Sequence, residues 1–190
     1  MALPGHKARC GIRAVECWKL PKRTTSVCRA ALCDQWAHSR FRTPYLRNTL
    51  WERGYAVDTL ETAVSWNKIP DLLARLQVSL QDGLAEMGER VHVFTHLSHV
   101  YRDGASIYVT YLFRLGESGQ ETLRRWEILK ATASQAIVET GGTISHQHGV
   151  GRDHMLYLAA EKGTLGMDAL QDVVHRFDPG RIMNPGKLVG

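Results

Sequence analysis

The chain has 190 residues, the size of one ordinary domain, so it can bury a core without disulfide or metal staples. Hydrophobic residues make up 44% and charged residues 23% of the sequence, close to the average of globular proteins, which excludes fibrous and low-complexity classes. Apolar runs are short and interrupted by charge, so no segment reaches the ~20 apolar residues that a transmembrane helix requires.

The net charge of +5 is concentrated at the N-terminus. Residues 1–38 hold seven basic and two acidic residues, which leaves residues 39–190 neutral as a set. A neutral folded part produces no general field that would attract a polyanion, so we expect no nucleic-acid partner.

The same N-terminal stretch contains all four cysteines, which are Cys10, Cys17, Cys28 and Cys33. Their spacing has no C-x-x-C pair, so it signals a zinc site only weakly. No secretory signal precedes them, which favours reduced thiols and a cytoplasmic protein. A transit peptide is a weak alternative because a clear amphipathic run of arginines is missing. We expect residues 1–38 to be a disordered or foreign extension.

After this stretch the pattern predicts alternating helices and strands. A helical turn and loop over 40–54 is followed by a strand over 55–66, where polar and apolar residues alternate. A helix then begins near Pro70 and ends around Gly88, with an apolar stripe at helical spacing. The stripe consists of Leu72, Leu73, Leu76, Leu80 and Leu84.

The second half of the pattern contains a hairpin and a long helix. Two strands over 90–101 and 105–114 are joined by the polar turn 102–104, so they are expected to pair antiparallel. A helix over 121–142 is closed by a glycine pair. Residues 143–151 then predict a last strand that ends as a glycine-rich loop.

The order β-α-β-β-α-β predicts an α+β fold of the ferredoxin-like kind, with an antiparallel sheet and both helices on one face. A C-terminal helical segment over 154–177 and an extended tail over 178–190 complete the chain. This fold hosts many functions, so function must be inferred from particular residues.

Two histidines are the first candidates. His146 and His148 are two apart on the predicted last strand, so their side chains leave the same face. Two imidazoles could exchange protons near neutral pH, bind an anion when charged, or ligate a metal when neutral. A catalytic or metal site needs a third group that this spacing does not supply, and the other interpretation is a polar strand end. We predict no metal site.

Tyr108 and Arg47 are the other candidates. Tyr108 shares the polar face of its strand with Ser106 and Thr110, where a phenol beside a cation could act as general acid or base. More often a strand tyrosine only packs. Arg47 is a solvated surface residue unless it faces a carboxylate or phosphate.

Four blocks of sequence resemble, in order, the C-terminal domain of FAD-linked oxidases of the vanillyl-alcohol oxidase superfamily. The blocks occupy residues 40–66, 95–114, 141–163 and 177–188. Within the superfamily they are similar to the alkyldihydroxyacetonephosphate synthases and their bacterial relatives. The resemblance runs from Trp36 to Leu188 and identifies residues 39–190 as a substrate, or cap, domain.

The resemblance implies roles for individual residues. By this resemblance, Tyr108 aligns with the family's catalytic tyrosine beside the flavin. Arg47 aligns with an arginine that contacts the substrate. A histidine triplet that matters for activity falls on residues 146–148, but here Gln147 replaces the middle histidine. That change puts a shared three-histidine relay in doubt and leaves roles for the outer two. Asn184 and Lys187 lie where the family's tail returns to the flavin domain, as cofactor-side residues.

The implied reaction replaces the acyl group of acyl-dihydroxyacetone phosphate by a fatty alcohol, with FAD as cofactor. In this family a separate N-terminal domain binds FAD, and residues 1–38 are too short to form one. We therefore expect a missing N-terminal FAD-binding domain, and an isolated chain that neither binds FAD nor turns over substrate. The expected partners are an FAD-binding domain or subunit and a small-molecule substrate, and a homodimer is left open.

Two other functions stay open. One is a fragment of an FAD-dependent 2-hydroxyacid dehydrogenase of the lactate or glycolate type. Metal-binding members of that group would carry Glu-His-Gly where this chain has Gln147, His148 and Gly149, which argues against it. The other is a non-catalytic ferredoxin-like binding module.

Overall fold

The computed structural model describes residues 28–189 and divides the chain into two compact units. The first unit ends at Asn48 and the second begins at Thr49, and each is described by itself. Helix α1 (Cys28–Ser39) and most of helix α2 (Thr43–Glu52) belong to the first unit. The second unit contains the sheet and the remaining helices.

Helix α1 covers the end of the stretch for which the sequence predicts a disordered or foreign extension. Residues 28–38 are helical instead of irregular. The rest of that extension, including Cys10 and Cys17, lies outside the described residues.

Three antiparallel strands form the sheet of the second unit, in the order β1-β3-β2. They are β1 (Tyr55–Ser65), β2 (His92–Val100) and β3 (Gly104–Arg114). The strand predicted over 55–66 and the antiparallel pairing predicted for the hairpin are confirmed. On β3 the residues at odd positions from Ala105 to Phe113 are buried, whereas Tyr108 is on the other face, opposite Glu61 of β1.

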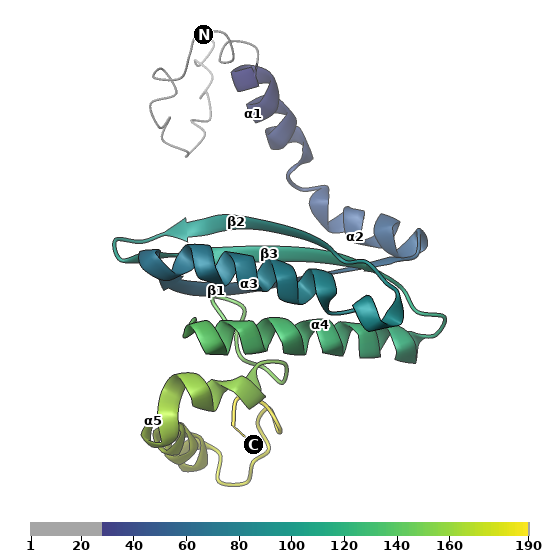
Figure 1. The fold of residues 1–190 in the computed structure, drawn as a ribbon. Helices are drawn as coiled ribbons and strands as arrows, with labels where there is room; N and C mark the ends of the chain where they lie inside the picture. Colours follow the sequence, from purple (N-terminus) through teal and green to yellow (C-terminus); the bar gives the residue numbers. More distant parts are fainter. Residues whose placement is uncertain (1–27, 190) are drawn as a thin grey trace, which may run out of the picture. The chain divides into compact units, whose positions relative to one another are not determined.

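Two helices pack on the apolar face of this sheet, as predicted (Figure 1). Helix α3 (Ile69–Asp82) has a proline in its first turn and ends before the predicted Gly88. Of the predicted stripe, Leu72, Leu76 and Leu80 are buried on the helix, Leu73 is partly buried, and Leu84 is buried just after the helix ends. Helix α4 (Gly119–Thr140) is capped by the Ser118 side chain, and Gly141 ends it in the left-handed conformation. Short 3-10 turns over Trp66–Lys68 and Ala85–Met87 flank α3.

The predicted fourth strand is wrong, although its segment lies where such a strand would be. The amide groups of Thr143 and His146 donate to the carbonyl oxygens of Ala63 and Glu61 on β1, at 3.1 and 2.9 Å. No ladder continues from there, because Gln147 and the glycines that follow have positive φ, which breaks the pleat. The α+β class is confirmed, with an irregular segment in place of the last strand.

Helix α5 (Met155–Phe177) confirms the predicted C-terminal helical segment. Its backbone is interrupted at Gly163, whose φ of 65° and ψ of 175° are not helical. The tail that follows is irregular, and Asp178 accepts hydrogen bonds from the amides of Ile182 and Met183. In the described part of the chain, every helix is too short or too polar to cross a bilayer.

Close packing at the hairpin gives a first prediction. A Cβ on Gly104 would overlap with the carbonyl oxygen of Val64 on the neighbouring strand. Gly104→Ala is therefore expected to lower the free energy of unfolding by about 1–3 kcal/mol, as overpacking does. Urea unfolding followed by circular dichroism measures this loss. Gly119→Ala is the control, since its Cβ meets nothing within 4 Å, and equal losses in both variants would contradict the prediction.

A polar network ties the sheet to α4. Oδ2 of Asp58 on β1 accepts hydrogen bonds from Tyr111 Oη at 2.9 Å, Trp126 Nε1 at 2.7 Å and Lys130 Nζ at 3.1 Å. Burial raises the pKa of Asp58, but the charge of Lys130 and these hydrogen bonds outweigh it, so the pKa is below its usual value. The ionised carboxylate therefore stabilises the folded state.

The sign of this effect gives a second prediction. Since the folded protein holds the Asp58 proton less tightly than the unfolded chain, the stabilisation is complete well above pH 3.8 and declines as the pH falls below that value. The difference in unfolding free energy between the unsubstituted protein and the Asp58→Asn variant should therefore shrink as the pH falls below 3.8. Urea unfolding at stepped pH measures it. Asp71→Asn, on an exposed carboxylate, should show no comparable trend.

Candidate active site on the polar face of the sheet

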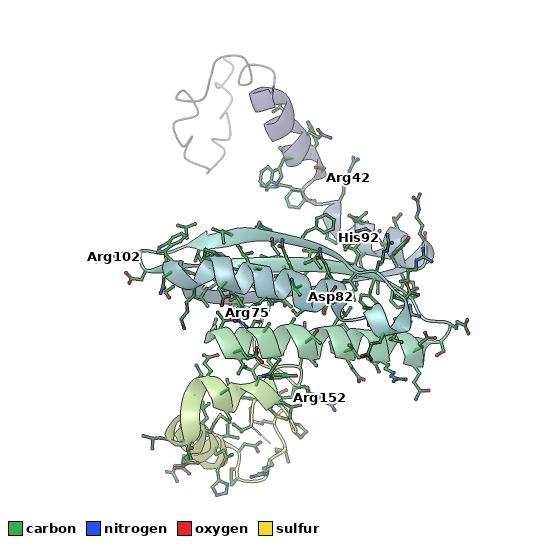
Figure 2. All side chains as sticks on the ribbon, in the orientation of Figure 1. Arg42, Arg75, Asp82, His92, Arg102 and Arg152 are labelled. Atoms are coloured by element: carbon green, nitrogen blue, oxygen red, sulfur yellow. The ribbon has the colours of Figure 1, made fainter. Side chains whose placement is uncertain are left out.

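One row of side chains crosses the sheet on the face away from α3 and α4. In this row Glu61 of β1 is paired with Tyr108 of β3, and Tyr108 is paired with His96 of β2. We call this side, which also carries Ser106, the polar face. Figure 2 labels His92 at the start of β2 and Arg102 at the hairpin turn, which bracket the strand that carries His96.

A β-bulge brings a further histidine to this face. The pairing of β2 with β3 shifts by one residue between Leu97 and Val100, so Ser98 and His99 both lie opposite Ser106. The amide of His99 donates to Ser106 Oγ at 2.9 Å. Without the bulge, alternation would place His99 on the same face as Leu97, toward the helices.

Glu61 is the centre of the cluster. Its side chain is only 3% exposed, and three imidazoles surround its carboxylate. Nδ1 of His146 and of His99 lie 3.1 and 3.2 Å from Oε1, while His148 Nε2 lies 3.5 Å from Oε2. Burial would raise the pKa of Glu61, but hydrogen bonds from Ser106, His99 and His146 lower it below its usual value. Glu61 is therefore ionised.

Two tyrosines complete the site. Tyr101 Oη lies 2.9 Å from His146 Nε2, on the side of the ring opposite Glu61. The Tyr108 ring stacks on His96 with centroids 5.2 Å apart and meets the edge of His148 at 5.7 Å. None of the side chains that the structure describes hydrogen-bonds the Tyr108 hydroxyl, which leaves this phenol able to contact a substrate.

Three of the predicted site residues are thus brought together. Tyr108, His146 and His148 lie on one face, as the alternation of an extended strand would have placed the two histidines. The cause is different, because a turn with Gln147 at a φ of 60° connects them. Their roles in catalysis stay a prediction.

The other predicted residues lie elsewhere. Arg47 is exposed on α2 in the first unit. Asn184 and Lys187 line a cavity between the last turns of α5 and the tail. Arg47 as a substrate contact and Asn184 and Lys187 as cofactor-side residues stay predictions.

Glu61, His99 and Tyr101 were not predicted from the sequence. Glu61 could have been suspected only from strand register, which sequence does not reveal, and His99 only from the bulge. Glu61, His99 and His146 each offer a ligand atom, and these atoms lie within 4.8 Å of one another. Among the described residues, this group could hold a metal ion.

Comparison with models of known protein families shows to which family the chain belongs. Residues 25–188 match the model of the family described as FAD linked oxidases, C-terminal domain. The chain belongs to this family. The match begins inside the stretch that the sequence had separated at residue 38, so helix α1 is included in the FAD-linked oxidase domain.

Individual relatives agree with the family. The chain is 27% identical over 156 residues to an alkyldihydroxyacetonephosphate synthase of Trypanosoma brucei brucei, which covers 82% of this chain and 25% of that protein. It is 31% identical over 157 residues to a D-lactate dehydrogenase of Anaerostipes hadrus, covering 77% of this chain and 31% of that protein. The chain thus spans about a quarter to a third of the relatives' length.

A solved structure of an alkyldihydroxyacetonephosphate synthase has a similar fold. The TM-score is 0.55 at 22% sequence identity, over 80% of this chain and 24% of the other. This likeness supports the fold of the FAD-linked oxidase domain alone.

Proposed function

We propose that this chain is the substrate-binding half of an FAD-dependent enzyme, similar to alkyldihydroxyacetonephosphate synthase. The observation that carries the proposal is the convergence of Tyr108, His146 and His148 on one face of the sheet, around the buried carboxylate of Glu61. A phenol beside an imidazole, with no hydrogen-bond partner among the described side chains, is suited to pass a proton to or from a bound substrate.

The cofactor would be held mainly by another part of the protein. Between residues 28 and 189 we find no glycine-rich turn from a strand into a helix, which is the usual cradle for a dinucleotide. The polar face fits the reactive end of the cofactor better, since Tyr108 and His148 present a phenol and an imidazole there. FAD would supply the electron-accepting chemistry, and Asn184 and Lys187 would lie toward the FAD-binding part.

The residues of this chain would then transfer the proton, position the histidines and bind the substrate. Tyr108 would move a proton at the carbon next to the substrate's carbonyl or hydroxyl group, with His148 beside its ring. Glu61 would hold His146 and His148 in place through its two oxygens. Arg47 would bind an anionic group such as a phosphate, for which a guanidinium is well suited. We expect the reaction to take place in the cytoplasm.

The relatives favour two substrate classes. Similarity to alkyldihydroxyacetonephosphate synthases suggests an acyl-dihydroxyacetone phosphate as substrate. Similarity to the D-lactate dehydrogenase of Anaerostipes hadrus suggests a 2-hydroxyacid. We favour the first class, because Gln147 replaces the glutamate expected in metal-binding dehydrogenases of the family.

The experiment joins the chain to the FAD-binding domain or subunit of its own protein. After FAD loading, one assay follows exchange of the acyl group of palmitoyl-dihydroxyacetone phosphate for hexadecanol, and a second follows flavin bleaching by D-lactate or glycolate. We expect the exchange and no bleaching. Bleaching alone would replace the synthase by the dehydrogenase. Loss of both activities in an assembly that binds FAD would reject an enzyme and support a binding module.

A further inference from the structure

His96 lies beside Tyr108 on the polar face and is exposed. The two residues are directly opposite each other on β2 and β3, and their rings are stacked, with centroids 5.2 Å apart and planes at 28°. Side chains paired in this way leave the same face of a sheet side by side. A molecule bound over the Tyr108 hydroxyl therefore also meets the His96 ring.

The ring nitrogens of His96 are available, in contrast to those of its neighbours. The carboxylate of Glu61 takes up one ring nitrogen from each of the other three histidines in the cluster, which are His99, His146 and His148. Within the described part of the chain, His96 makes only its ring contact with Tyr108 and no hydrogen bond through a ring nitrogen. Either tautomer of this imidazole can present an N–H group to a ligand.

The position of His96 in its row suits an oxygen atom that becomes negative. β3 lies between β1 and β2, so Tyr108 separates His96 from the ionised Glu61. Neighbouring strands are about 4.8 Å apart, which places His96 and Glu61 roughly 10 Å from each other. Since Coulomb repulsion falls with distance, Glu61 repels a negative oxygen beside His96 much less than one beside His148, whose Nε2 is 3.5 Å from Oε2.

The proton transfer proposed for Tyr108 requires a group with these properties. When the carbon next to the substrate's carbonyl gives its proton to the phenolate form of Tyr108, the electron pair of the C–H bond forms a C–C double bond. The electron pair of the carbonyl bond moves onto its oxygen, which gains the negative charge. A positioned N–H donor stabilises this oxygen. A neutral imidazole is sufficient, as in other enzymes that remove a proton next to a carbonyl group.

We propose that His96 is a catalytic residue, whose ring N–H group donates a hydrogen bond to the carbonyl oxygen of the substrate, beside the carbon that Tyr108 deprotonates. The inference rests on the proposed function and deepens it, because it names the substrate group that a second residue of the polar face recognises. That group is a ketone oxygen next to the reacting carbon, as in acyl-dihydroxyacetone phosphate.

Two substitutions of His96 separate this role from simple packing. His96→Phe keeps an aromatic ring on Tyr108 and removes the N–H group, whereas His96→Gln removes the ring and keeps an N–H donor. In the chain assembled with its FAD-binding part, His96→Phe should lower kcat of the exchange reaction by about 100- to 1,000-fold, the usual loss when one donor to such an oxygen is removed. His96→Gln should lose at most about tenfold, since its amide can still donate. A residue that only stacks on Tyr108 would give the reverse order.

His92→Phe is the matched control. His92, labelled in Figure 2, is exposed on the same face of β2 and is paired with Leu112 instead of Tyr108. Its kcat should be unchanged. A loss equal to that of His96→Phe would overturn the proposal, because it would show that any histidine removed from this strand lowers the rate.

Binding of an analogue gives a second readout that needs no turnover. In phosphoglycolohydroxamate, an analogue of dihydroxyacetone phosphate, the hydroxamate oxygen imitates the negative oxygen of the deprotonated substrate. Calorimetry on the same assembly should give a Kd about 100-fold higher in His96→Phe than in the unsubstituted protein. The Kd of dihydroxyacetone phosphate itself should rise at most about tenfold, because its neutral carbonyl oxygen accepts a weaker hydrogen bond.

Failure of this inference and failure of the proposed function give different results. If the unsubstituted assembly does not exchange the acyl group, the proposed synthase function fails and the role of His96 is rejected with it. If the unsubstituted assembly is active, but His96→Phe keeps either its kcat or its affinity for the hydroxamate, only the role of His96 is overturned. A larger loss of kcat in His96→Gln than in His96→Phe would also overturn it.

Discussion

Tyr108→Phe should lower kcat by about 100- to 10,000-fold in the chain assembled with its FAD-binding part, the range over which a positioned acid or base contributes to catalysis. The phenol has His148 at its edge and His96 on its face, and no described side chain occupies its hydroxyl. Phenylalanine keeps both ring contacts and removes only the hydroxyl group. KM should therefore change little, and steady-state kinetics of the exchange reaction measures both parameters.

The matched control for this loss is Tyr55→Phe. Tyr55 begins the same sheet, opposite Arg114, and lies far along β1 from the row that contains Glu61. Its removal tests whether loss of any phenol from the sheet lowers kcat. Undiminished kcat in Tyr108→Phe, or the same loss in Tyr55→Phe, would show that Tyr108 only packs.

Leu76→Ala should lower the free energy of unfolding by about 2–5 kcal/mol, as removal of a fully buried leucine does. Leu76 is 0% exposed in the middle of α3, where it packs into the core between the helices and the sheet. Small domains are stable by only about 5–15 kcal/mol, so this substitution removes a large part of the total. Urea unfolding followed by circular dichroism measures the loss.

Val78→Ala on the same helix is the control, because its side chain is 57% exposed. Its effect should stay within about 0.5 kcal/mol, as for most surface substitutions. Comparable losses at both positions would mean that α3 does not bury the leucine stripe against the sheet.

Much of the fold could be predicted because its elements carry strong local patterns. The leucines of α3 repeat at helical spacing, and the odd positions of β3 from Ala105 to Phe113 all carry apolar or aromatic side chains that are buried. These patterns reflect burial on one face, which is the dominant energetic term for each element. The fourth strand could not be predicted correctly, since the positive φ of Gln147 depends on the turn that follows and not on the pattern around it.

The site was harder to predict than the fold for a physical reason. Tyr108, His146 and His148 could be singled out one by one, but the group that joins them, Glu61, comes from a strand far away in the sequence. Its place opposite Tyr108 depends on strand register, which local sequence does not encode. His99 was missed because regular alternation assigns it to the other face of β2.

The bulge at Ser98 and His99 also affects how related chains should be aligned. A homologue that lacks the equivalent of Ser98 would restore a regular ladder and still present its histidine to Glu61, because that histidine would then stand alone opposite Ser106. A gap at Ser98 in an alignment is therefore compatible with a histidine that reaches Glu61 at this place.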